Sequence, residues 1–216
     1  MTMPRTSDAL IAELVDGLEP VRPLRFGEGL LLALGAAAVS AVVVLGIYGL
    51  RYDLAAGLVD PMHLVATGLY LGLALAATVT VVVMGRPQVG SDHTGWRWAA
   101  AMAGLLPLAG VIVAAARGTS VFSPGSMTMG QECLEVGIGS SLLVFGMLVL
   151  WLRRGAPTAP GRAGLVAGIA AGAFGTFTFS LHCPANDIVH IGIWHSAVVL
   201  AMGLVGRAVV PHLVKW

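Results

Sequence analysis

The sequence predicts an all-α integral membrane protein, a bundle of six transmembrane helices with both termini in the cytoplasm. Of its 216 residues, 57% are apolar and only 11% are charged, whereas average chains are about 45–50% apolar and about 25% charged. A body of this size cannot turn so large an apolar excess inward. Composition therefore excludes an ordinary soluble enzyme and a disordered chain. A net charge of +1 also leaves no basic footprint for direct binding of nucleic acid.

Six apolar stretches approach the length of about 20 residues that a helix needs to cross a bilayer. They cover residues 27–50, 62–84, 96–116, 133–152, 163–181 and 188–210, and proline, glycine or charged residues separate them. The stretches do not alternate apolar and polar residues, which argues against a membrane β-barrel. We therefore expect a cytoplasmic tail over residues 1–26 and a six-helix transmembrane domain over 27–216, which ends in a short C-terminal tail. The fifth stretch carries Gly164, Gly168 and Gly172, a spacing that lets two helices approach closely in lipid.

The basic residues predict the orientation. Ten lie on one side of six spans and two on the other. The majority side holds Arg5, Arg22, Arg25, Arg86, Arg97, Arg153, Arg154, Arg162, Arg207 and Lys215, and the minority side Arg51 and Arg117. Because basic residues concentrate in cytoplasmic segments, both termini are expected in the cytoplasm. The first apolar stretch follows an acidic segment, so we expect the first helix itself, rather than a secretory signal, to direct insertion.

The tail contains a predicted amphipathic helix. Ser7 can cap a helix that starts at Asp8, and Pro20 ends it. Apolar residues recur at helical spacing between acidic ones: Leu10, Ile11, Leu14, Val15 and Leu18 alternate with Asp8, Glu13, Asp16 and Glu19. A helix on a membrane surface is usually basic, so this acidic helix suits a groove on a partner protein. Packing beneath its own bundle is the other interpretation, and the spacing leaves both open.

The opposite side carries both cysteines, Cys133 and Cys183. Other side chains with sulfur, amide, carboxylate or imidazole groups lie near them in the sequence: Met127, Met129, Gln131, Glu132, Glu135, His182, Asp187, His190 and His195. Three interpretations of the pair stay open. It can form a structural disulfide in an oxidising compartment, bind a soft metal or act as a reactive thiol switch.

If the site binds a metal, Cys133, Cys183 and His190 are the expected core, with zinc or cadmium as the fitting ion. Three ligands with an open fourth position would make an exchangeable site. Further candidate ligands are His182, Glu132 and Glu135.

Asp187 and His195 are expected to support the site rather than bind the ion. Asp187 precedes His190 by three residues and can orient that imidazole or cap the sixth helix; the cap is the simpler interpretation. His195 follows Trp194 and suits a buried polar anchor. His63 and His93 are expected to make local hydrogen bonds.

The chain resembles one family along its whole length. The residues that carry the resemblance are Asp8-Ala-Leu-Ile-Ala-Glu-Leu, Pro20-Val-Arg-Pro-Leu-Arg25, His182-Cys183-Pro184 followed by His190 and Trp194-His195, and the terminal Lys215-Trp216. They are similar to those of the negative regulator of sigma F family, bacterial inner-membrane anti-sigma factors that are not enzymes.

The resemblance implies that the protein sequesters an extracytoplasmic-function (ECF) sigma factor. A heavy metal or an oxidant at the outer face would then release it through Cys133 and Cys183. The expected sigma-binding residues are Leu10, Ile11, Glu13, Leu14, Asp16, Leu18, Arg22 and Arg25. The alternative is a small membrane transporter or a membrane redox or metal-binding protein. The absence of an acidic residue near the middle of any span argues against transport.

Overall fold

The computed structural model describes residues 6–18, 23–86 and 94–214, and within these ranges it contains helices and no strand. In chain order the elements are α1 (Ser7–Asp16), α2 (Phe26–Tyr48), α3 (Tyr52–Ala55), α4 (Pro61–Met84), α5 (Gly95–Arg117), α6 (Pro124–Arg154), α7 (Pro160–Ser180), α8 (Ile188–His190), the π-helical turn η1 (Ile191–His195) and α9 (Ser196–Leu213). Helices α8, η1 and α9 follow one another without a break. Six helical segments are long and apolar enough to cross a membrane, so the predicted all-α class is confirmed for the described residues, and the six predicted stretches each form a helix of spanning length.

Helix boundaries agree with the apolar stretches to within about three residues, except at α6. The sequence suggested that Cys133 opens the fourth helix, but α6 begins at Pro124. Proline is favoured at the first helical position because its missing N–H is not needed there. The Gly, Ser, Thr and Met residues that follow dilute the hydropathy without breaking the helix. Met127 and Met129, which precede the predicted stretch 133–152, are therefore part of the helix.

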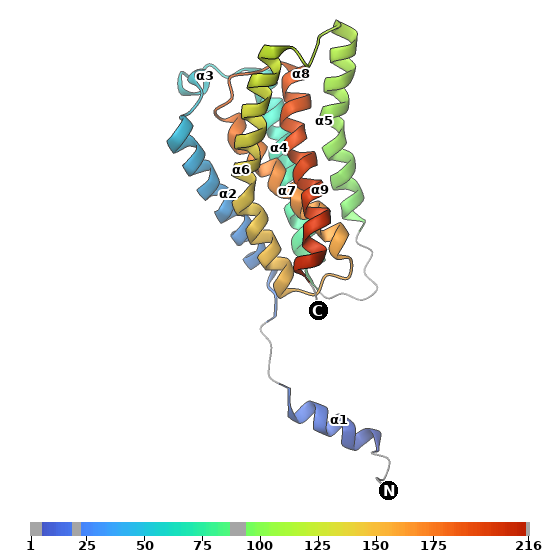
Figure 1. Ribbon diagram of the computed structural model, residues 1–216. Helices are drawn as coiled ribbons and strands as arrows, with labels where there is room; N and C mark the ends of the chain where they lie inside the picture. The colour runs from blue at the N-terminus through green and yellow to red at the C-terminus, as the bar shows by residue number, and fades with distance from the viewer. Residues whose placement is uncertain (1–5, 19–22, 87–93, 215–216) are drawn as a thin grey trace.

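Helix α1 is shorter than expected. It starts at Ser7 rather than Asp8 and ends at Asp16, followed by Gly17; Pro20, the expected end, lies outside the described residues. None of its residues is buried. Figure 1 shows α1 apart from the helical bundle, so in this structure its apolar stripe is not packed beneath its own spans.

Helix α7 forms the centre of the bundle, and α9, α6 and α4 pack around it (Figure 1). Its glycines permit this. A Cβ atom on Gly164 or Gly168 would collide with a backbone carbonyl of α9, that of Gly206 or Met202, and a Cβ on Gly175 would collide with Ser141 of α6. The glycine stripe thus sets how closely the central helices approach.

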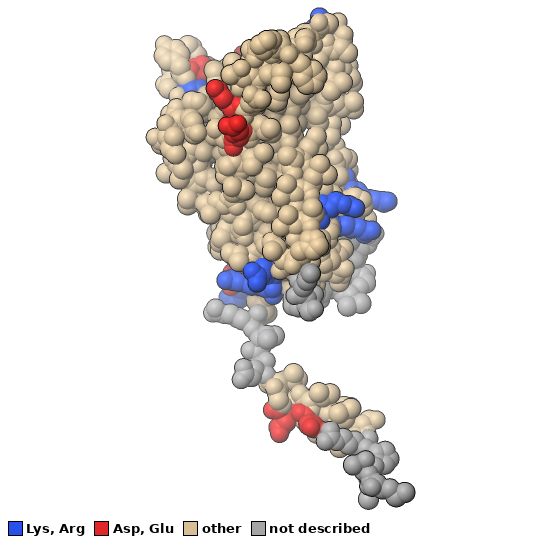
Figure 2. All heavy atoms as spheres, viewed as in Figure 1, with Lys and Arg blue, Asp and Glu red and all other residues tan. Residues whose placement is uncertain are grey.

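Charged residues separate the bundle into two ends. Most of the arginines lie at one end of the bundle, here called the arginine end. One terminus of each long helix of the bundle, α2, α4, α5, α6, α7 and α9, lies there. The arginine end carries Arg25, Arg86, Arg97, Arg153, Arg154, Arg162 and Arg207. The cysteine end carries Cys133, Cys183, Arg51 and Arg117. Figure 2 shows blue basic atoms gathered at the lower end of the bundle. Arg5, Arg22 and Lys215 lie outside the described residues.

Candidate thiol–imidazole site

Four buried side chains meet at the cysteine end. Cys133 comes from α6, Cys183 from the loop between α7 and α8, His190 from α8 and His195 from η1. None is more than 8% exposed. Both thiols are free, and their Sγ atoms lie 3.8 Å apart. Nε2 of His190 lies 3.3 Å from Sγ of Cys133 and 3.9 Å from Sγ of Cys183. One ring nitrogen of His195 completes a set of four ligand atoms that lie within 4.8 Å of one another.

The loop that carries Cys183 is fixed at both of its ends. Helix α7 stops at Ser180, and the backbone N–H of Cys183 donates to the carbonyl of Phe179, 3.0 Å away. At the other end, Asp187 caps α8, because its Oδ2 accepts from the backbone N–H groups of Val189 and His190 at 3.0 and 3.3 Å. Its Oδ1 pairs with exposed Arg117 at 2.8 Å. The carboxylate of Asp187 therefore acts on the backbone of His190 and not on its ring.

The π-helical turn η1 brings the two imidazoles together. Residues five apart diverge around an α-helix, where each residue turns by about 100°, but the i→i+5 bonding of a π turn stacks them on one side. The rings of His190 and His195 consequently lie 5.3 Å apart between centroids. Two side chains bind carbonyls of this turn: the hydroxyl of Tyr70 donates to Ile191 at 3.1 Å and that of Thr176 to His195 at 3.2 Å. Single π turns often occur at functional sites.

His195 has one occupied nitrogen and one without a partner. Its Nδ1 lies 3.3 Å from the hydroxyl of Ser180. Its Nε2 is buried and has no hydrogen-bond partner among the described residues. Because a buried polar atom without a partner costs free energy, this nitrogen marks a position where a ligand can bind.

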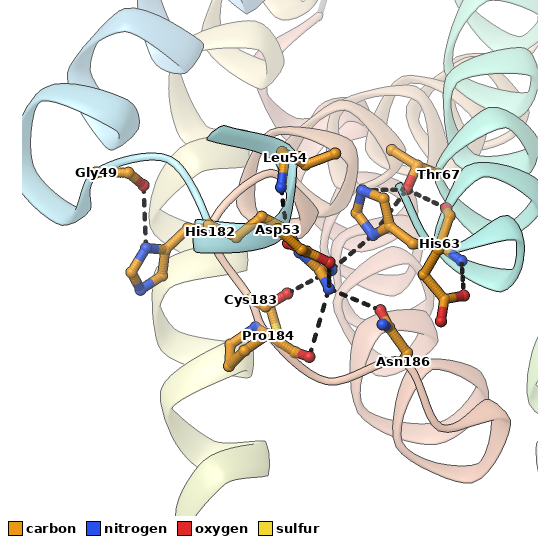
Figure 3. A network of polar contacts seen from close by, with 11 residues as sticks. Gly49, Asp53, Leu54, His63, Thr67, His182, Cys183, Pro184 and Asn186 are labelled. Atoms are coloured by element: carbon orange, nitrogen blue, oxygen red, sulfur yellow. Dashed lines mark hydrogen bonds and ion pairs between the residues drawn. The ribbon is translucent and has the colours of Figure 1, made fainter. Parts of the chain in front are cut away.

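Arg51 is buried and bonds to the Cys183 loop. Figure 3 labels its partners Cys183, Asn186, Asp53 and His63. Nη1 of Arg51 donates to the carbonyl of Cys183 at 2.8 Å, and Nη2 donates to Oδ1 of Asn186 at 2.9 Å. The guanidinium also pairs with both oxygens of Asp53 at 2.6 Å and donates to Nδ1 of His63 at 2.8 Å. Since arginine has no acceptor, Nδ1 of His63 must be the unprotonated nitrogen.

The charge state of the loop follows from these contacts. A hydrogen bond from the Cys133 thiol lowers the pKa of Cys183, and a contact with Nε2 of His190 acts in the same direction, against burial, which raises the pKa. Cys183 is thus the thiol that gives up its proton more readily. Hydrogen bonds from Arg51 lower the pKa of Asp53, so this pair stays ionised and nearly neutral in sum.

Some candidate residues lie outside the cluster. Nδ1 of His182 lies 3.1 Å from the carbonyl of Gly49, and this histidine does not join the four ligand atoms. Glu132 and Glu135 are exposed on α6. Sequence reasoning overlooked Arg51, although it is one of only two basic residues on the minority side. It treated His63 as a local contact, whereas His63 joins the Arg51 network.

These features define a class: a helical protein with six helices able to span a membrane, a buried thiol–imidazole cluster at one end of the bundle and an exposed amphipathic helix before the first of the six. Comparison with known proteins identifies the family within this class. The profile of the family described as "Negative regulator of sigma F" matches residues 14–216, so the chain belongs to this family.

Two relatives support the same assignment. The chain is 34% identical to "Anti-sigma-F factor NrsF" of Caulobacter vibrioides, over 97% of each chain. It is 28% identical to "Probable anti-sigma-F factor NrsF" of Azospira oryzae, over 98% of this chain and 100% of the relative. Both names describe regulators rather than enzymes. No solved structure matches the chain.

Proposed function

We propose that this protein is a membrane anti-sigma factor that holds an ECF sigma factor at the cytoplasmic face of the bacterial inner membrane. A heavy metal or an oxidant that reaches the cysteine end from outside changes the state of Cys133 and Cys183, and the sigma factor is released. Membership of the family and the names of both relatives support the anti-sigma role. The observation that carries the sensing role is the 3.8 Å separation of two free, buried sulfur atoms.

The thiol pair suits either signal. A soft metal ion can bind both sulfurs after each thiol loses its proton. An oxidant can instead accept two electrons from the pair, so that the sulfurs bond to each other and two protons leave. Either event ties α6 to the loop between α7 and α8, because Cys133 and Cys183 come from these two elements.

The other end of the molecule supports the binding role. The arginine end satisfies the positive-inside rule if it faces the cytoplasm, and α1 precedes α2 at that end. The apolar side chains of α1 and of Leu18 just after it are exposed: Leu10, Ile11, Leu14, Val15 and Leu18. A free amphipathic helix suits a hydrophobic groove, and its acidic residues complement the basic surface of a protein that binds DNA. Arg25 adjoins this segment at the start of α2, and Arg22 lies outside the described residues.

The test is sigma-dependent transcription measured beside the membrane abundance of the protein, with and without cadmium or an oxidant. We expect Cys133→Ser and Cys183→Ser each to change the response while abundance stays normal. Val136→Thr is the matched control, because Val136 packs against the same cysteines and its replacement leaves both thiols in place. A cysteine-free protein that responds normally would refute the sensing role.

A further inference from the structure

We infer that Cys133, Cys183, His190 and His195 form a closed four-ligand site for one divalent soft cation, with Zn²⁺ and Cd²⁺ as the fitting ions. This inference deepens the proposed function, on which its regulatory meaning rests, by naming the complete ligand set and the charge of the ion. It assigns His195 as the fourth ligand, in place of an open coordination position.

The distances agree with tetrahedral coordination. With Zn–S of about 2.3 Å and Zn–N of about 2.0–2.1 Å, a tetrahedral site separates two sulfurs by about 3.8 Å and a sulfur from a nitrogen by about 3.5 Å. The two Sγ atoms lie 3.8 Å apart. Nε2 of His190 lies 3.3 and 3.9 Å from them. Only small side-chain shifts are needed to centre an ion among these three atoms.

His195 supplies the fourth position. Its Nδ1 is occupied by Ser180, at 3.3 Å, whereas its buried Nε2 has no partner among the described residues. A ligating histidine usually has its second nitrogen held by a hydrogen bond in this way. The π turn also supports His195 as a ligand, because it brings the rings of His190 and His195 to the same side of the helix.

Charge selects a divalent ion. Two thiolates and two neutral imidazoles balance a 2+ ion, so the loaded site carries no net charge in a region where an uncompensated charge is costly. A monovalent soft ion would leave one negative charge unbalanced. The nearby guanidinium of Arg51 does not alter this sum, because Asp53 already pairs with it at 2.6 Å. Loading releases the two thiol protons to solvent.

X-ray absorption of the purified full-length protein loaded with Zn²⁺ tests the ligand set without any mutation. We expect two sulfur and two imidazole nitrogen ligands per ion. Two sulfurs with one imidazole and a water oxygen would refute the four-ligand set. A shell made only of oxygen and nitrogen would refute the site as a whole.

Competition titration with Cd²⁺ and a chelator gives the second test. We expect His195→Ala to weaken binding by about 100-fold or more, above the 10–100-fold range for loss of an outer-shell partner. His182→Ala is the matched control, because His182 is a neighbouring imidazole that binds the backbone of Gly49 instead. It should leave the affinity within about twofold. Equal affinities of the two variants would overturn the assignment of His195.

The two proposals fail separately. Tight binding through four ligands without sigma release on addition of cadmium would refute the sensing role but retain the metal site. The opposite outcome combines two results: sigma release depends on both cysteines, and the His195→Ala variant binds cadmium as tightly as the unmodified protein. This outcome would retain the sensor and refute the four-ligand site.

Discussion

Arg51 is the residue on which the geometry of the cysteine loop most depends. It is buried at the cysteine end of the bundle, which has few basic residues. Its position is therefore an exception to the concentration of basic residues at the arginine end. Its guanidinium satisfies the carbonyl of Cys183 and the side chain of Asn186, and its backbone N–H donates to Leu181 at 3.0 Å. One side chain from the loop after α2 therefore fixes the position of a thiol more than 130 residues further along the chain.

Replacing Arg51 by lysine should destabilise the protein although it keeps the charge. An ammonium group cannot reproduce the planar fork that binds several acceptors at once. Lysine would leave a buried acceptor such as the carbonyl of Cys183 without its hydrogen bond, which costs about 1–3 kcal/mol. The free energy of unfolding in detergent should fall by about this amount, and cadmium affinity should fall with it. Arg117→Lys is the control, because its pair with Asp187 is exposed and such pairs are worth about 0–1 kcal/mol. Equal effects of the two changes would contradict the role of Arg51.

The sequence predicted part of this site. Both cysteines and His190 were identified because soft ligands stand out in an apolar chain. His195 was assigned a supporting role, since residues five apart do not share a face of an α-helix, and nothing in the pattern revealed the π turn. Arg51 was counted only as a charge. Its contacts join segments distant in the sequence, and a single sequence carries no signal for such a pairing.

At the scale of the helices, the lipid environment made the spans predictable. A helix must be apolar over a fixed length to cross a bilayer, and this requirement is visible in composition alone. The start of α6 was missed because residues 124–132 are polar enough to resemble a loop. The central place of α7 depends on glycines whose contacts with α9 and α6 are set by tertiary packing.

Gly168→Ala tests this packing. The added Cβ would collide with the carbonyl of Met202 on α9, a rigid backbone atom, so α7 and α9 must separate. Overpacking of this kind typically costs about 1–3 kcal/mol. Gly146→Ala is the control: it lies on α6 with open space around the new Cβ, and alanine favours a helix by up to about 1 kcal/mol. Thermal unfolding in detergent should lower the midpoint for the first variant only. An unchanged midpoint for Gly168→Ala would show that the two helices can separate without cost.

Helix α1 is tested by placing a charge on its apolar stripe. Leu14→Asp should weaken retention of the sigma factor at the membrane by roughly tenfold or more if Leu14 enters a buried pocket on the partner. Ala12→Asp adds the same charge on another face of the same helix and should have little effect. Co-purification of the sigma factor with the membrane fraction measures both. Full retention by Leu14→Asp would mean that α1 does not dock through this stripe.

At the scale of the whole molecule, the bundle connects two ends with different chemistry. Helix α6 runs from Pro124 to Arg154, so one rigid element carries Cys133 near the cysteine end and Arg153 and Arg154 at the arginine end. A contact that shifts α6 against α7 can therefore reach both ends. A metal ion that binds the sigma-releasing state a few kcal/mol more tightly than the sigma-holding state is enough to shift the populations of the two states. Coordination by two thiolates can supply this difference.

The proposed sensor works only if the cysteine end faces outward and the arginine end faces the cytoplasm. The arginines of the described spans favour this orientation: seven lie at the arginine end, against Arg51 and Arg117 at the other. Arg51 is buried and paired with Asp53, so it adds little to the positive-inside signal. Alkaline phosphatase fused after Ser120, between α5 and α6, should be active, because this enzyme needs an oxidising compartment for its disulfides. The same enzyme fused after Ala156, between α6 and α7, should be inactive, while a green fluorescent protein at that position should fluoresce. The reverse pattern would place the thiols in the reducing cytoplasm and would refute an outer-face sensor.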